Sequence, residues 1–257
     1  MTTTAHDNMS FLEHLEELRW HVIRSLIAII SAGFICFLMK DFIFDTIIFG
    51  PKKMDFPTYK FLCQAATFIG VETTFCGDEF PFVVQNRTMA GQFSAHVMTS
   101  VIAGFIISFP YVLYEFWKFI SPGLLAKEKS KSRGFIFISS LLFFIGVLFG
   151  YYIICPLSIN FLGTYQVSSE VLNEIDLGSF ISLVRSSAIA SGIIFELPII
   201  IYFLTKAGVV TPKSLVKYRK YALVLVLILA AIITPPDIAS QIIVAIPIVI
   251  LYQVSIF

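Results

Sequence analysis

Apolar residues dominate this chain in six long stretches, separated by shorter polar segments. The stretches lie at about residues 22–39, 93–117, 134–154, 180–204, 221–233 and 238–257. A helix needs about 20 apolar residues to cross a bilayer core that is about 30 Å thick. Most of the stretches come close to or exceed that length, and the fifth is the shortest. The pattern therefore predicts an all-α polytopic membrane protein with six transmembrane helices.

Prolines predict that several of these spans are kinked or short. Pro110 and Pro198 should kink the second and fourth spans, Pro156 should end the third, and Pro247 should break the sixth. The fifth span covers only about 20 Å at 1.5 Å per residue. Two readings stay open for it: the bilayer thins beside it, or flanking residues from Arg219 and Thr234 complete the span by snorkelling.

A charged helical stretch precedes the first span. Ser10 followed by Glu13 forms a capping box, which predicts that a helix begins here. An apolar stripe then recurs at helical spacing: Phe11, Leu12, Leu15, Leu18 and Val22. Glu16 and Glu17 lie off this stripe, so residues 1–20 predict an amphipathic helix on the membrane surface that runs into the first span. The helix either only anchors that span or offers its carboxylates to a cationic ligand.

Composition and charge fix the class of protein and its orientation. The 257 residues are 57% hydrophobic and only 14% charged, which excludes an ordinary soluble domain. Most of the eighteen Lys and Arg residues fall at the N-terminus and in the loops near 118–133 and 206–220. The positive-inside rule therefore predicts that both termini are cytoplasmic. Residues 21–257 form a single six-helix domain in this reading, with a long first extracytoplasmic loop at about 41–91, and no cleavable signal is expected.

Two ionisable residues fall inside the fourth span. Glu196 is about 12 Å deep from the nearer end, and Arg185 precedes it by about three helical turns on the same side. Such residues are costly in lipid and indicate function by default, although a structural polar contact within the bundle explains them equally well. Glu128 is the single acid in a basic loop, where a solvated surface charge is the simpler interpretation.

The cysteines and histidines do not predict an enzyme. Cys36 and Cys155 fall in apolar spans, whereas Cys63 and Cys76 share one loop and can pair if it faces an oxidising compartment. The spacing alone leaves that disulfide open. The histidines make no metal-binding motif with the cysteines, and no serine-hydrolase elbow occurs. We expect no cofactor, no metal and no nucleic-acid partner.

Several motifs together resemble the TatC family, the multispanning component of the twin-arginine protein translocase. The resemblance covers nearly the whole chain. It is carried by FLEHLEELR at 11–19, FPYVLYEFWKFISPGL at 109–124 with Glu128 after it, FGY at 149–151 with Pro156, FELP at 195–198, and TPPD at 234–237 with Ser240, Gln241, Ile246 and Pro247. The first outer loop, which holds Cys63 and Cys76, matches no family pattern.

The resemblance implies a receptor for signal peptides with two consecutive arginines. Glu17 and Glu128 would then hold the two arginines, and Phe119 would pack against the apolar part of the peptide. Two adjacent guanidinium groups need two carboxylates for bidentate bonding, and lysine cannot reproduce that geometry. We assign Glu16 and Arg19 to the same site.

The same resemblance implies a translocase core for folded proteins, powered by the proton-motive force in the bacterial inner membrane. Glu196 would lie in a polar membrane groove together with Arg185, and the outer tip between the last two spans would carry Pro235, Pro236 and Asp237. The implied partners are twin-arginine signal peptides, small single-span proteins of the TatA and TatB type, further copies of this chain, and membrane lipids.

One alternative from another class remains. Glu196 and Arg185 in one span are also compatible with a proton-coupled small-solute transporter. Such transporters often show two similar halves with broken helices, and no convincing internal repeat is present here.

Overall fold

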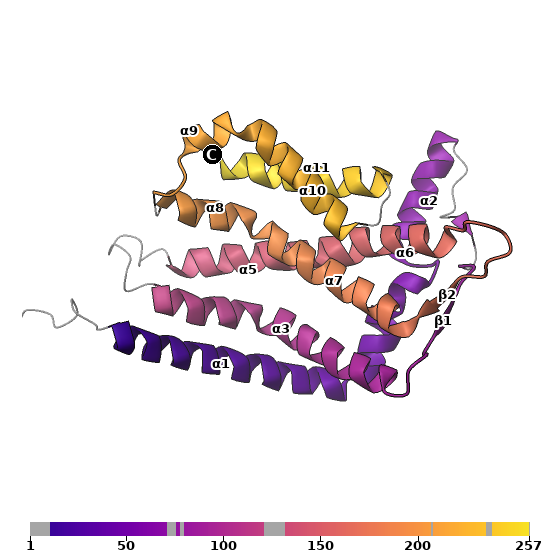
Figure 1. Ribbon diagram of the computed structural model, residues 1–257, viewed down its shortest axis with the longest axis horizontal. Coiled ribbons are helices and arrows are strands. Elements are labelled where there is room, and N and C mark those ends of the chain that lie inside the picture. Colours follow the sequence, from indigo (N-terminus) through magenta and orange to yellow (C-terminus); the bar gives the residue numbers. More distant parts are fainter. Residues whose placement is uncertain are drawn as a thin grey trace, which may run out of the picture. The chain divides into compact units, whose positions relative to one another are not determined.

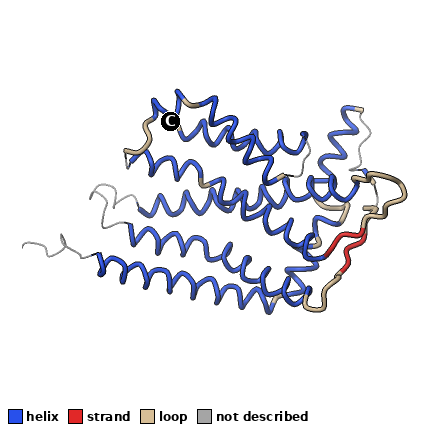
Figure 2. Tube along the Cα trace, viewed as in Figure 1, coloured by secondary structure: helices blue, strands red, loops and turns tan. Residues whose placement is uncertain are grey.

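A computed structural model of the chain describes residues 11–70, 76–77, 80–120, 132–206, 208–234 and 238–256. The chain divides into two compact units, which are described separately. Unit 1 comprises the described residues of Met1–Leu38 and Ser100–Ser140, and unit 2 those of Met39–Thr99 and Leu141–Phe257. In the described part, helices make up most of the trace and two short strands pair with each other (Figure 2).

The longer helices follow the predicted apolar stretches (Figure 1). Their bounds are α1 Phe11–Leu38, α3 Gly91–Ile120, α5 Ser132–Phe149, α6 Cys155–Thr164, α7 Leu177–Phe195, α8 Leu197–Lys206, α10 Arg219–Ile233 and α11 Ile238–Ser255. As predicted, α1 continues without a break from the charged N-terminal stretch into the apolar run. Ser10 of the expected capping box lies outside the described residues. The structure describes the backbone of Glu13 but not its side chain.

Four of these helical segments are long and apolar enough to cross a membrane. They are Leu15–Leu38, Gly91–Ile120, Gly134–Thr164 and Leu177–Lys206. Within the described ranges, Ser240–Ser255 is a shorter apolar helix, and α10 has 15 residues. The protein is therefore a mostly helical, multi-pass membrane protein.

In unit 1, α1 packs on α3 through glycine. A Cβ atom at position 104 would lie 2.4 Å from the backbone N of Gly33 and 2.6 Å from the carbonyl O of Ile29. Only a residue without a side chain allows this approach, which is how helices pack closely in lipid. Gly104, in the first half of the second span, thus marks a close helix contact.

In unit 2, the last turn of α5 and the residue that follows it pack on α7 in the same manner. A Cβ at Gly150 would lie 2.2 Å from the carbonyl O of Ser187, and a Cβ at Gly146 would lie 2.7 Å from that of Ser191. Gly146 and Gly150 form a Gly-x-x-x-Gly pattern, which is typical of closely packed helices in lipid, and both glycines mark such a contact here.

The third span does not end at Pro156, so that prediction was wrong. The π-helix η5, Gly150–Ile154, joins α5 to α6, and the helical segment continues to Thr164. Pro156 occupies the first turn of α6. A proline lacks the backbone N–H that would bond to the preceding turn, and the hydroxyl of Thr58 donates to the carbonyl of Tyr152 in that turn.

The fourth span is interrupted beside its buried acid. Helix α7 ends at Phe195 and α8 begins at Leu197, so the break falls on Glu196, two residues before the predicted kink at Pro198. The backbone N–H of Glu196 bonds to Ile193 O at 3.1 Å, which tightens the last turn of α7.

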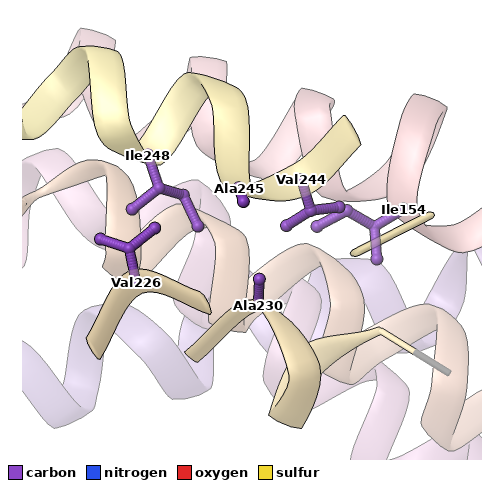
Figure 3. Packing of buried hydrophobic residues seen from close by; sticks show 6 residues of the cluster. All are labelled: Ile154, Val226, Ala230, Val244, Ala245 and Ile248. Atoms are coloured by element: carbon purple, nitrogen blue, oxygen red, sulfur yellow. The ribbon is translucent and has the colours of Figure 1, made fainter. Parts of the chain in front are cut away.

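Helices α10 and α11 share an apolar cluster in unit 2 (Figure 3). The cluster contains Ile154, Val226, Ala230, Val244, Ala245 and Ile248. Pro247 lies between two of these residues and inside α11, so the predicted break of the sixth span was wrong. A helix in lipid tolerates an interior proline when neighbouring helices pack around the weakened turn.

The segment between α1 and α3 is more ordered than a loop. It contains the π-helix η1 Phe42–Ile48, the 3₁₀ turn η2 Gly50–Lys52, α2 Pro57–Ile69 and β1 Val83–Gln85. Strand β1 pairs in parallel with β2, Glu174–Asp176. Tyr59 is completely buried. Its hydroxyl proton is shared between Pro51 O at 2.9 Å and Pro156 O at 3.0 Å, which ties α2 to α6. Burial raises the pKa of the Tyr59 hydroxyl.

Candidate functional site

A buried hydrogen bond between His21 and Glu115 links α1 to α3 in unit 1. The Nδ1 atom of His21 lies 2.6 Å from Oε2 of Glu115, whose residue is only 2% exposed. An ionised carboxylate only accepts hydrogen bonds, so Nδ1 of His21 carries the donated proton. Arg24, one helical turn after His21, brings Nη1 to 3.8 Å from the same oxygen. The carboxylate of Glu115 is thus satisfied inside the unit.

Aromatic rings pack around this pair. The ring of Phe119 lies 6.3 Å from the His21 ring in an edge-on arrangement. The Trp117 ring lies 4.6 Å from the Phe135 ring of α5 at a tilt of 30°, which packs the last turns of α3 against α5. Edge-to-face and offset contacts of this kind add stability beyond burial alone. The end of α3 is therefore a fixed surface.

Glu17 lies one helical turn before His21 on α1, so the two side chains share a face. Its Oε2 atom is buried and has no hydrogen-bond partner among the described residues. A buried carboxylate oxygen without a donor is costly, and native structures rarely leave one unless a ligand or partner completes it. Glu17 therefore differs from Glu115, which has its donors within the unit.

The neighbouring predicted residues are arranged differently. Glu16 and Arg19 form an exposed pair with 3.9 Å between Oε1 and Nη2. Arg19 also lies 5.8 Å from the centre of the Trp20 ring. Pairs this exposed contribute little to stability, so both side chains can rearrange at low cost.

The structure thus brings Glu17 and Phe119 into one unit, where Glu17 lies one helical turn before His21 and the Phe119 ring contacts the His21 ring. Glu128, predicted as the second carboxylate, lies outside the described residues. The sequence interpretation missed His21 and Glu115, although Glu115 was quoted within a motif. The available signal was Glu115 near the end of an apolar span, together with a histidine that continues the helical spacing from Glu17.

Unit 2 carries the predicted pair of the fourth span. Glu196 is 8% exposed at the break between α7 and α8. Arg185, on α7, has Nε and Nη1 buried without a hydrogen-bond partner in the described part of the chain. A guanidinium offers five donors, so Arg185 keeps binding capacity that the described residues do not use.

The two remaining predicted features have different outcomes. The structure joins Cys63 and Cys76 in a disulfide, with their Cα atoms 5.2 Å apart. Pro235, Pro236 and Asp237 lie outside the described residues. Across the described ranges, no group of three or more His, Cys, Asp and Glu side chains is arranged to hold a metal ion.

Comparisons with known proteins agree on one family. The family model described as Sec-independent protein translocase protein (TatC) matches residues 13–247. The protein named Sec-independent protein translocase protein TatC from Blattabacterium sp. subsp. Periplaneta americana (strain BPLAN) is 48% identical over 252 residues, covering 98% of this chain and 95% of that protein. Its namesake from Aquifex aeolicus (strain VF5) is 35% identical and covers 97% and 94%.

Solved structures give the same result for the fold. A crystal structure of the twin arginine translocase receptor TatC in DDM superposes with a TM-score of 0.72 at 34% identity, covering 95% of this chain and 98% of the other. A second crystal structure of the twin arginine translocase receptor TatC reaches 0.68 at the same identity. Sequence and fold thus agree over nearly the whole length, and the chain belongs to the TatC family of Sec-independent protein translocase proteins.

Proposed function

We propose that this protein is the receptor for twin-arginine signal peptides and the membrane core of a translocase for folded proteins. The observation that carries the proposal is the buried Oε2 of Glu17, which has no donor among the described residues. An arginine of the peptide supplies that donor. A charge-assisted hydrogen bond of this kind contributes about 1.5–3 kcal/mol.

The surroundings of Glu17 suit a peptide that combines charge with apolar side chains. His21 and Arg24 occupy the Glu115 carboxylate, so that acid supports the site and Glu17 stays available. Phe119 is half-buried beside His21 and offers its remaining ring surface to the apolar part of the peptide. Glu128 is the second carboxylate in this proposal, and the exposed Glu16–Arg19 pair rearranges at the rim.

The membrane arrangement belongs to the same proposal. Six helices cross the bacterial inner membrane with both termini cytoplasmic, the last two being α10 and α11. At 15 residues, α10 is about 22 Å long, so the bilayer thins beside it. The Cys63–Cys76 disulfide supports an extracytoplasmic position for the loop that contains α2, because disulfides persist in oxidising compartments.

Transport uses a second region in this proposal. Glu196 and Arg185 lie in a polar membrane groove, where proteins of the TatA and TatB type and further copies of this chain assemble during transport driven by the proton-motive force. The partly unused donors of Arg185 support such a role, since ionisable groups in lipid are retained mainly for function. Pro235, Pro236 and Asp237 form the outer tip.

Peptide binding to purified protein tests the receptor proposal. A labelled signal peptide with two arginines is titrated and compared with the same peptide carrying two lysines. We expect Glu17→Gln to weaken binding of the arginine peptide by tenfold or more, because one charge-assisted bond is lost. Phe119→Ala should weaken binding by a smaller factor.

The matched control is Glu170→Gln, which removes the same charge from an exposed position outside this site. It should change the affinity by less than threefold. Equal affinity for the lysine peptide, or equal losses in Glu170→Gln and Glu17→Gln, would contradict the proposal.

A further inference from the structure

A cavity of about 610 Å³ opens in unit 2, and none of the predicted site residues lines it. Four segments line it: residues 40–52 after α1, strand β1 and the residue following it, the first turns of α3, and the start of α7. The lining residues are Lys40, Asp41, Phe44, Asp45, Phe49, Lys52, Val84, Asn86, Gln92, Phe93, His96 and Leu177.

The cavity lies where apolar spans begin and end. The first apolar span ends at Leu38, two residues before Lys40, and two others begin at Gly91 and Leu177. Residues at these positions lie at the boundary between the hydrocarbon core and the headgroup region. The ligand that meets this cavity is therefore a molecule of the membrane interface.

Both signs of charge line the cavity in equal number. Lys40 and Lys52 are the cations, and Asp41 and Asp45 are the anions. Lys40 and Asp41 form a loose exposed pair at 3.9 Å. Within the described ranges, neither the Asp45 carboxylate nor the Lys52 ammonium makes an ion pair within 4.0 Å; Lys52 instead lies 5.9 Å from the centre of the Phe82 ring. Two charges of opposite sign are thus available to one ligand.

The rest of the lining is apolar or aromatic. Phe44 packs edge-on against His96 at 5.6 Å, and Phe93 is 67% exposed on the first turn of α3. A charged wall beside exposed phenylalanine suits an amphiphile, because the two surfaces receive its headgroup and its chain separately. The N-terminus of α3 adds a positive backbone field that favours a phosphate.

We propose that this cavity binds the headgroup of a zwitterionic phospholipid that carries a primary ammonium, as phosphatidylethanolamine does. The phosphate lies against Lys52 and Lys40, the ammonium lies at Asp45, and an acyl chain runs along Phe44 and Phe93. A lipid with only negative charge meets repulsion from Asp41 and Asp45. This inference is independent of the signal-peptide site, because none of its residues belongs to that site.

Lipid binding by native mass spectrometry tests the inference. Delipidated protein in detergent is mixed with equal amounts of phosphatidylethanolamine and phosphatidylglycerol. We expect phosphatidylethanolamine to be retained preferentially, and Lys52→Gln and Asp45→Asn each to lower its retention by about tenfold, since each variant removes one charge-assisted contact. Lys52→Arg keeps the cation and should retain the lipid.

Two control variants remove one positive and one negative charge from positions outside the cavity lining. Lys60→Gln and Asp55→Asn change exposed residues and should leave retention unchanged. Thermal unfolding of each variant identifies any loss that comes from misfolding; if Lys52→Gln misfolds, Asp45→Asn carries the test. Equal retention of phosphatidylglycerol, or equal losses in the lining and control variants, would overturn the inference.

A soluble headgroup separates the lipid from a free phosphate ester. Glycerophosphoethanolamine carries the same two charges without acyl chains. It should displace the lipid only at concentrations at least a hundredfold higher, because the chain contacts with Phe44 and Phe93 are missing. Displacement at equal concentrations would overturn the lipid assignment and identify the headgroup alone as the ligand.

Discussion

Unit 1 and unit 2 both bury ionisable side chains, but they satisfy them to different degrees. In unit 1, Glu115 receives His21 at 2.6 Å and Arg24 at 3.8 Å. In unit 2, the Nε and Nη1 atoms of Arg185 are buried without a partner among the described residues. A satisfied pair stabilises a helix contact, whereas unused donors or acceptors indicate where another molecule binds. The comparison therefore contrasts a charge that is satisfied within its unit with a charge whose donors the described residues leave unused.

The same comparison holds inside unit 1. Glu17 lies one helical turn from His21 and Glu115 bonds to it, yet only Glu115 has its donors in place. Substitution of Glu115 should therefore mainly lower stability, whereas substitution of Glu17 should mainly weaken peptide binding. The predictions below test this separation, beginning with the largest expected effect.

Removal of the Glu115 carboxylate should cost the most stability. Glu115→Ala leaves the buried Nδ1 of His21 without its acceptor, and a buried donor left unpaired costs about 1–3 kcal/mol. Glu115→Gln keeps an acceptor for His21 and should cost less. The measurement is the free energy of unfolding in mixed micelles.

Glu17→Ala is the matched control for Glu115→Ala. Because the buried Oε2 of Glu17 has no partner among the described residues, its removal should leave the free energy of unfolding within about 1 kcal/mol of the wild type. If the two alanine variants lose equal stability, the distinction between the two acids is wrong.

Arg185→Met should leave stability unchanged or raise it by up to about 2 kcal/mol. Methionine fills a similar volume, and replacing a buried charge that lacks good partners by an apolar side chain is often neutral or stabilising. Thermal unfolding in detergent measures this effect, and an export assay in cells measures the accompanying loss of transport.

The control for Arg185→Met is Arg24→Met, which removes a guanidinium that does have a partner. Its side chain is 52% exposed and pairs with Glu115, so it should lower stability by up to about 1 kcal/mol. A large loss of stability in Arg185→Met would show that Arg185 is a structural charge, and the contrast between the units would fail.

The sequence was sufficient to predict most helices because lipid imposes a simple rule. A chain in hydrocarbon must satisfy its backbone internally, so long apolar stretches become helices. The glycine contacts at Gly104 and Gly150 were also readable, since small residues at helical spacing permit close packing. These features depend on local sequence alone.

Contacts between residues that are distant in the chain could not be predicted from local sequence. The His21–Glu115 pair joins residues 94 positions apart, and neither residue alone specifies the other. The two prolines were misjudged because a local rule was applied without its context. Pro156 lies in the first turn of a helix after a π-helix, and Pro247 lies beside two residues of the apolar cluster formed by α10 and α11.

The smallest predicted effect concerns the start of α7, where unit 2 has a carboxylate that is satisfied by backbone. Asp176 accepts from the backbone N–H of Gly178 at 2.9 Å and of Ser179 at 3.3 Å. This is an N-cap, and its loss costs about 1 kcal/mol. Asp176→Ala should therefore lower the free energy of unfolding by that amount, and Asp176→Asn should retain most of it because an amide oxygen also caps.

Glu170→Ala changes an exposed acid a few residues earlier and should have no measurable effect on stability. Asp176 also pairs with Gln85 in the strand register, but that contact is made by the backbone and survives the substitution. If Asp176→Ala abolished transport without loss of stability, the carboxylate would act on a partner rather than on its own helix. Hydrogen-bond donors within reach of a buried charge would then no longer identify that charge as structural. Each such residue would need its own functional assay.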